Sequence, residues 1–93
     1  MHTLIKKAIK ERIVVQFIYQ GKKQVIEPYV LGYEKNSHVL MLLGYRILTS
    51  EKEHCWKLFV FEEITELSLV DLKAYSYRVG MARNLNKIKT IVA

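Results

Sequence analysis

One apolar run constrains the fold of this chain more than any other segment. It spans residues 38–45 and reads His-Val-Leu-Met-Leu-Leu-Gly-Tyr. A polar turn at residues 34–37 precedes it, and a charged loop at residues 49–54 follows. Short apolar runs between turn signals are typical of strands that are buried on both faces. We therefore expect a central strand here, reaching to about Leu48, with the rest of the sheet laid down around it.

Four other segments have the β-branched and aromatic composition of strands. They cover residues 13–19, 24–33, 55–61 and 64–69. Gly21 can supply the positive φ of a turn between the first two. Pro28 cannot donate to a sheet ladder, so the second of these strands should lie at an edge or be bulged or bent there. A long bent strand is how small barrels pass from one sheet to the other.

Two amphipathic segments flank the strands. Residues 3–11 carry one apolar helical stripe, made by Leu4, Ile5, Ala8 and Ile9. A helix this short is marginal alone and must dock on the sheet. Near the C-terminus, Met81, Leu85 and Ile88 keep a helical period while Arg83 and Lys87 share another face. This pattern predicts a basic amphipathic helix over residues 81–91.

The segments together predict a mainly β fold. We expect a small SH3- or Sm-like five-stranded barrel with a short N-terminal helix and a C-terminal amphipathic helix. An open antiparallel sheet with helices on one face is the alternative. The barrel domain would cover residues 1–73, and residues 74–93 would form a basic helical extension.

Charge favours one class of partner. The chain of 93 residues has a net charge of +6, and residues 1–10 and 72–93 contain no acid. Basic ends favour polyanionic partners. No apolar run approaches the roughly 18–20 residues that span a bilayer, and the N-terminus lacks the features of a signal peptide. We therefore expect a cytoplasmic protein with no membrane association.

The sequence contains few residues in arrangements typical of catalytic or metal sites. The single cysteine, Cys55, excludes an internal disulfide and a cysteine-rich zinc site. His2, His38 and His54 have no ligand spacing, so no metal is expected. No Ser/His/Asp arrangement, paired-carboxylate motif or phosphate loop is present in the sequence. We expect a non-enzyme that uses no cofactor.

Several short motifs follow one another along the chain in the order found in a known family. Residues 15–19 read Val-Gln-Phe-Ile-Tyr, residues 26–31 read Ile-Glu-Pro-Tyr-Val-Leu, and residues 57–64 read Lys-Leu-Phe-Val-Phe-Glu-Glu-Ile. These segments resemble motifs of the WYL domain. Residues 15–19 resemble its first strand, residues 26–31 its Val-Glu-Pro segment, and residues 57–64 its Arg-x-Phe-Arg-Leu-Asp-Arg-Ile segment. Residues 40–45 fall on its Trp-Tyr-Leu signature. That family is the Sm-like barrel module of many bacterial transcription regulators. The resemblance spans about residues 4–70.

The apolar skeleton of the family is kept better than its polar positions. The family's Trp, Tyr and arginines are replaced by Leu40, Met41, Gln24, Lys57, Val60 and Glu63. The resemblance implies the Sm-like fold and nucleotide or nucleic-acid sensing through basic positions. Family members usually carry a DNA-binding helical domain before this module, and about ten residues precede the first strand here. We therefore expect a free-standing module that either has a DNA-binding partner protein or binds nucleic acid itself.

The candidate ligand-binding residues are Lys22, Lys23, Tyr45, Arg46 and Lys57. Lysines in the first hairpin can hold a phosphate, and tyrosine faces can stack on bases. Tyr45 and Arg46 are consecutive, so they should point to opposite faces of their strand. The leading hypothesis is a dimeric regulatory module that binds a nucleotide or single-stranded nucleic acid through these residues. The alternative is a protein–protein interaction or homo-oligomerisation module that docks through a barrel edge or the C-terminal helix.

Overall fold

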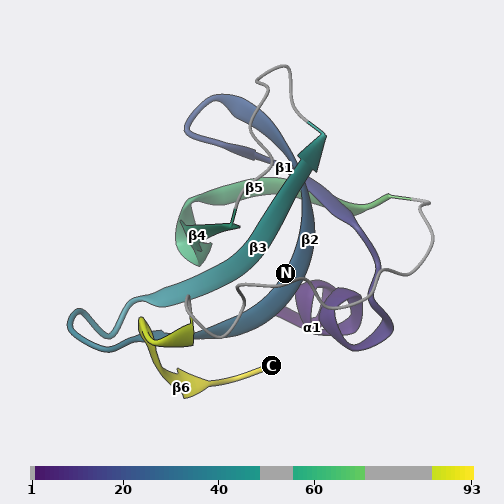
Figure 1. Ribbon diagram of the computed structural model, residues 1–93. Coiled ribbons are helices and arrows are strands. Elements are labelled where there is room, and N and C mark those ends of the chain that lie inside the picture. The colour runs from purple at the N-terminus through teal and green to yellow at the C-terminus, as the bar shows by residue number, and fades with distance from the viewer. Residues whose placement is uncertain (1, 49–55, 71–84) are drawn as a thin grey trace.

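The computed structural model describes residues 2–48, 56–70 and 85–93 (Figure 1). The elements follow in the order α1 (His2–Glu11), β1 (Val15–Tyr19), β2 (Lys22–Glu34), β3 (Leu40–Leu48), β4 (Trp56–Val60), the 3-10 helix η1 (Phe61–Glu63), β5 (Ile64–Leu69) and β6 (Ile88–Ile91). The described chain is therefore mainly β with an N-terminal helix, as the sequence predicts. In these three ranges no helix is long and apolar enough to cross a membrane.

The sheet is organised around β2. All strand pairs are antiparallel, and the order is β4-β3-β2-β1-β5, with β6 paired to the end of β2. β2 is 13 residues long, which lets it pair with β1, β3 and β6. β3 is an inner strand paired with β2 and β4, as expected for residues 38–45, but the middle strand of the order is β2 and not β3. Across the described residues no pairing joins β4 to β5, so the sheet is not closed.

A bulge in β2 bends the strand near its proline. The register with β3 shifts between Pro28 and Val30, which confirms the irregularity expected from a residue that cannot donate to the ladder. Gly44 lies opposite Pro28, and a methyl group at Gly44 would collide with the Cγ2 atom of Ile26. The absence of a side chain at Gly44 therefore lets β3 follow the bend, and Figure 1 shows β2 and β3 curving together.

Both faces of β3 are covered, as predicted. Leu42 and Leu43 are each fully buried, but they belong to two different clusters. The first cluster, which we call the inner core, joins α1 to the sheet: Ile5, Ala8, Val15, Phe17, Ile26, Leu31, Leu42, Phe59, Phe61 and Ile64. The second, which we call the outer cluster, consists of Tyr29, Val30, Leu43 and Ile88, with Tyr45, Trp56, Leu58 and Leu85 packed against them. Adjacent strand residues point to opposite faces, which is why one apolar run supplies both clusters.

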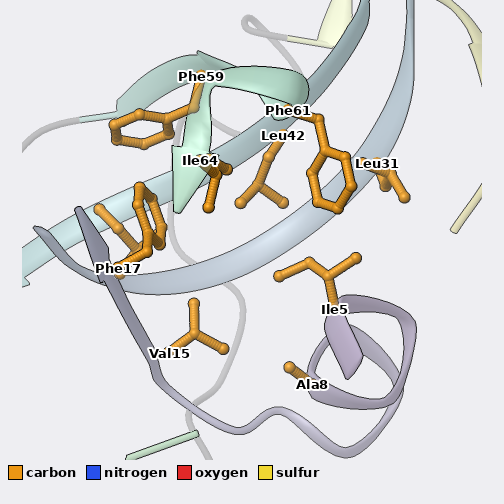
Figure 2. Close-up of a cluster of buried hydrophobic side chains, with 10 residues drawn as sticks. Ile5, Ala8, Val15, Phe17, Leu31, Leu42, Phe59, Phe61 and Ile64 are labelled. Atoms are coloured by element: carbon orange, nitrogen blue, oxygen red, sulfur yellow. The ribbon is translucent and has the colours of Figure 1, made fainter. Parts of the chain in front are cut away.

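Helix α1 docks on the inner core through its apolar stripe. Figure 2 shows Ile5 and Ala8 pointing from the helix toward the sheet residues of this core. Ile5 and Ala8 have no exposed surface. Burying a side chain of the size of Ile5 stabilises a fold by about 1.5–3 kcal/mol. This docking offsets the low intrinsic stability of a 10-residue helix.

The C-terminal segment differs from its prediction. Residues 88–91 form the strand β6, so the predicted helix over residues 81–91 is wrong there, and residues 81–84 lie outside the described residues. The β-branched residues of this segment favour a strand, and the edge of β2 offers partners for its backbone. A Cβ atom at Gly32 would lie 2.5 Å from Ile88 Cγ2, so only glycine allows β6 to approach this closely. Among the described residues the sheet therefore has six strands, where five were expected.

Candidate ligand-binding face

The register places the five predicted site residues on the first half of β2 and on the two strands beside it, β3 and β4. Lys22 and Lys23 begin β2, directly after the turn at Gly21, whose φ is 77° as predicted. Arg46 pairs with Ile26, near the same end of β2. Tyr45 pairs with Trp56 at the start of β4, and Lys57 follows. The five residues thus lie on three adjacent strands, with Lys57 level with Pro28, six residues along β2 from Lys22.

Three of the cations share the inner face. Arg46 pairs with Ile26, a member of the inner core, so Arg46 lies on the inner face. Lys57 pairs with Gly44, which is two residues from Arg46 and therefore on the same face. Lys22 pairs with Tyr19, which packs against the inner core. We call this group, with Gln24, the basic inner end.

Tyr45 and Lys23 lie on the other face. Tyr45 pairs with Glu27 and packs in the outer cluster, its ring edge-on to Trp56 with centroids 5.4 Å apart. The predicted opposition of Tyr45 and Arg46 is thereby confirmed. Lys23 pairs with Ile18 and lines a pocket of about 390 Å³ together with Glu66. The structure does not bring these two residues to the basic inner end.

Burial differs sharply within the basic inner end. Arg46 is 6% exposed and Gln24 is 7% exposed, while Lys22 and Lys57 are exposed. Arg46 and Lys22 already make contacts with other groups of the chain. A buried guanidinium acts in surroundings of low dielectric, where its interactions are stronger than in water. The exposed lysines would add charge at the opening of the same face.

Gln24 has an unusual environment that the sequence did not reveal. It pairs with Phe17 and therefore faces the inner core. In the part of the chain that the structure describes, its Oε1 atom is buried and accepts no hydrogen bond. A buried acceptor left unsatisfied costs about 1–3 kcal/mol. Gln24 is two residues from the buried Ile26, and this spacing could have indicated that it faces the core. In the sequence, Gln24 was noted only as the replacement of a family arginine.

Glu27 is a second polar residue whose role the sequence left open. Glu27 is 4% exposed and pairs with Tyr45 of the outer cluster. The hydroxyl of Tyr29 donates a hydrogen bond of 3.1 Å to its Oε1 atom. The rings of Tyr29 and Trp56 are 4.8 Å apart beside it. Glu27 thus anchors aromatic packing at the bend of β2, and a lone acid inside an apolar strand was the signal for such a role.

Metal ligands do not gather in the described part of the chain. Within residues 2–48, 56–70 and 85–93, no group of three His, Cys, Asp or Glu residues is placed to hold a metal ion. Two residues considered from the sequence, His54 and Cys55, lie outside these ranges.

Comparisons of this chain with protein-family models, with curated proteins and with solved structures find no match. The resemblance to the WYL domain therefore stays a prediction from short motifs. The functional inference must come from the residues that the fold brings together, above all the basic inner end.

Proposed function

We propose that this chain is a non-enzymatic, cytoplasmic sensing module that binds a nucleotide or single-stranded nucleic acid at the basic inner end. The observation that carries the proposal is the register, which puts Lys22, Arg46 and Lys57 on the inner face of the adjacent strands β2, β3 and β4. In keeping with the WYL resemblance, ligand binding would be linked to bacterial transcription regulation through a DNA-binding partner protein.

Each group has a distinct part in binding. The planar guanidinium of Arg46 can hold two oxygens of one phosphate, and its burial favours a fixed geometry. Lys22 and Lys57 are exposed and act as flexible point charges on neighbouring phosphates. The buried Oε1 atom of Gln24 can accept a hydrogen bond from a ligand hydroxyl or amine. Because Lys22 and Arg46 already make contacts, the ligand exchanges those contacts for its own.

The proposal includes a small SH3- or Sm-like barrel as the finer description of the fold. Support comes from the 13-residue strand β2, which is bulged and pairs with strands on both sides. Further support comes from a hydrogen bond between Tyr19 of β1 and Val60 of β4, two strands that are not paired. Such a link draws the two sides of the curved sheet together.

The test is a titration with a short labelled oligonucleotide at about 50 and 200 mM salt. Affinity should fall as salt rises, because phosphate contacts release counterions. Lys57→Ala should weaken binding and lower the salt slope by about one. Lys23→Ala is the matched control, since Lys23 is also an exposed lysine but faces the other side of the sheet. Absence of binding at low salt, or affinity indifferent to salt, would contradict the proposal.

A specific observation also favours the alternative function, homo-oligomerisation. Ile91 is 61% exposed and Val92 is 39% exposed, and β6 pairs with β2 on one side alone among the described strands. A strand edge with exposed apolar side chains can pair with a second copy. Light scattering should then give the mass of a dimer for the native chain and of a monomer for Ile91→Lys. A native mass of 11.0 kDa would exclude this alternative.

A further inference from the structure

A second pocket lies at the opposite end of the inner core. It has a volume of about 480 Å³ and is lined mainly by His2, Tyr33, His38, Leu40, Phe61 and Glu62. Pockets that bind small molecules usually measure about 300–1,000 Å³. Tyr33 pairs with Leu40 at the far end of β2 from Lys22, so this pocket is separate from the basic inner end. We call it the aromatic pocket.

The walls of the aromatic pocket provide a stacking surface. Phe61 is 4% exposed, and the ring of His2 stacks on it with centroids 4.9 Å apart and an angle of 11° between the planes. Tyr33 is 40% exposed, more than any other Phe, Tyr or Trp among the described residues. His2 and Tyr33 are the exposed rings of this pocket, and they suit a planar aromatic ligand, which gains about 1–3 kcal/mol per stacked base.

The rim of the aromatic pocket is polar and well positioned. His38 has a φ of 58°, and its backbone N–H donates to the carbonyl oxygen of Glu34 at 3.2 Å. The Ser37 hydroxyl donates to Glu34 Oε1 at 2.9 Å, which helps to hold the turn. A neutral imidazole offers one donor and one acceptor, whereas the carboxylate of Glu62 offers acceptors only. The rim is therefore suited to a ligand with several hydrogen-bond donors on one edge.

We propose that the aromatic pocket binds a guanine base. Guanine is planar, and its ring N–H and exocyclic amino group are adjacent donors that match the two oxygens of the Glu62 carboxylate. The imidazole of His38 can serve its remaining polar edge. Glu62 at the rim disfavours a phosphate or carboxylate in this position, since like charges repel. This site does not rest on the proposed phosphate-binding function, because a neutral nucleoside satisfies it.

The test is a titration with neutral nucleosides, followed by ¹⁵N–¹H NMR of the full chain. Guanosine should shift the amide signals of Tyr33, His38 and Glu62 with an affinity that does not change with salt. Inosine, which lacks the amino group, should bind about tenfold more weakly or worse, the loss expected for a hydrogen bond to a charged group. Adenosine lacks the ring N–H and should not bind in this way.

A matched pair of variants isolates the carboxylate. Glu62→Gln should weaken guanosine binding by about tenfold or more. Glu63→Gln should leave it unchanged, because Glu63 is exposed on the same 3-10 helix but does not line the pocket. No binding of guanosine, equal binding of adenosine, or an unaffected Glu62→Gln variant would overturn this inference. Salt-dependent binding of an oligonucleotide that Lys57→Ala weakens would still support the phosphate site in any of these cases.

Discussion

The backbone N–H of Val60 donates a hydrogen bond of 3.1 Å to the hydroxyl of Tyr19, a residue 41 positions earlier in the chain. The two residues belong to β4 and β1, which are not paired in the sheet. The ring of Tyr19 also lies edge-on to Phe59, with centroids 4.9 Å apart. One side chain therefore connects the edge strand β4 to the opposite side of the curved sheet.

Tyr19→Phe should destabilise the fold by about 1–3 kcal/mol, because the part-buried N–H of Val60 loses its acceptor while the ring packing is kept. Urea denaturation followed by tryptophan fluorescence measures this change. Tyr33→Phe is the control, since Tyr33 is 40% exposed and its hydroxyl can bond to water. Equal stability of Tyr19→Phe and the native chain would show that this link contributes nothing.

Gln24→Met should stabilise the free protein and weaken ligand binding at the same time. Methionine keeps the approximate shape of glutamine but removes the buried Oε1 atom that accepts no hydrogen bond among the described residues. Relief of an unsatisfied acceptor is worth about 1–3 kcal/mol. Urea denaturation and the oligonucleotide titration measure the two effects. Lower stability of Gln24→Met would mean that the amide is already satisfied in solution, against this prediction.

Gly32→Ala should detach β6 from β2 without unfolding the rest of the sheet. The added Cβ would lie 2.5 Å from Ile88 Cγ2 and 2.6 Å from the carbonyl oxygen of Thr90. Overpacking of this kind costs about 1–3 kcal/mol. Hydrogen exchange should therefore accelerate at the amides of Val92 and Ala93, which donate to the carbonyl oxygen of Leu31.

Gly21→Ala is the matched control for this prediction. Its φ of 77° strains any other residue, so some stability is lost, but nothing lies within 4 Å of the added atom. Exchange at Val92 and Ala93 should then rise only as far as the global stability falls. Amides of Val92 and Ala93 that stay protected in Gly32→Ala would contradict the close-approach argument.

Local composition predicted most of the strands. β1 and β5 lie within or match the segments expected from β-branched and aromatic content, and the helix α1 covers the expected residues 3–11. The turn at Gly21 and the bulge beside Pro28 also follow from properties of single residues, φ freedom in one case and a missing donor in the other. These features depend on neighbours in the chain, so sequence patterns contain them.

The C-terminal segment was mispredicted for a physical reason. Ile88 and Leu85 fit a helical period, but a short apolar pattern is compatible with either period. The segment forms a strand because Gly32 leaves room for it beside β2. The backbone of β2 around Gly32 and Tyr33 also offers an edge with which it can pair. Neither condition is local to residues 88–91, so no reading of that segment alone could have found them.

In the candidate site, too, some features follow from the local sequence and others from long-range pairing. Alternation along a strand predicted that Tyr45 and Arg46 would face opposite sides. The sequence did not show that Lys22 and Lys23 face opposite sides, because it placed both in a turn. Only the pairing of Lys22 with Tyr19 and of Lys23 with Ile18 assigns each lysine to a face. The burial of Gln24 and the aromatic pocket likewise depend on distant segments meeting.

By itself, then, the sequence determined the mainly β character, the docking helix, the bend in β2 and the two-sided burial of Leu42 and Leu43. These follow from side-chain periodicity and backbone preference, which act over a few residues. The tertiary structure decided that β2 rather than β3 organises the sheet, that residues 88–91 become its sixth strand, and which cations share the inner face. Those outcomes depend on long-range strand pairing, whose register no single segment contains.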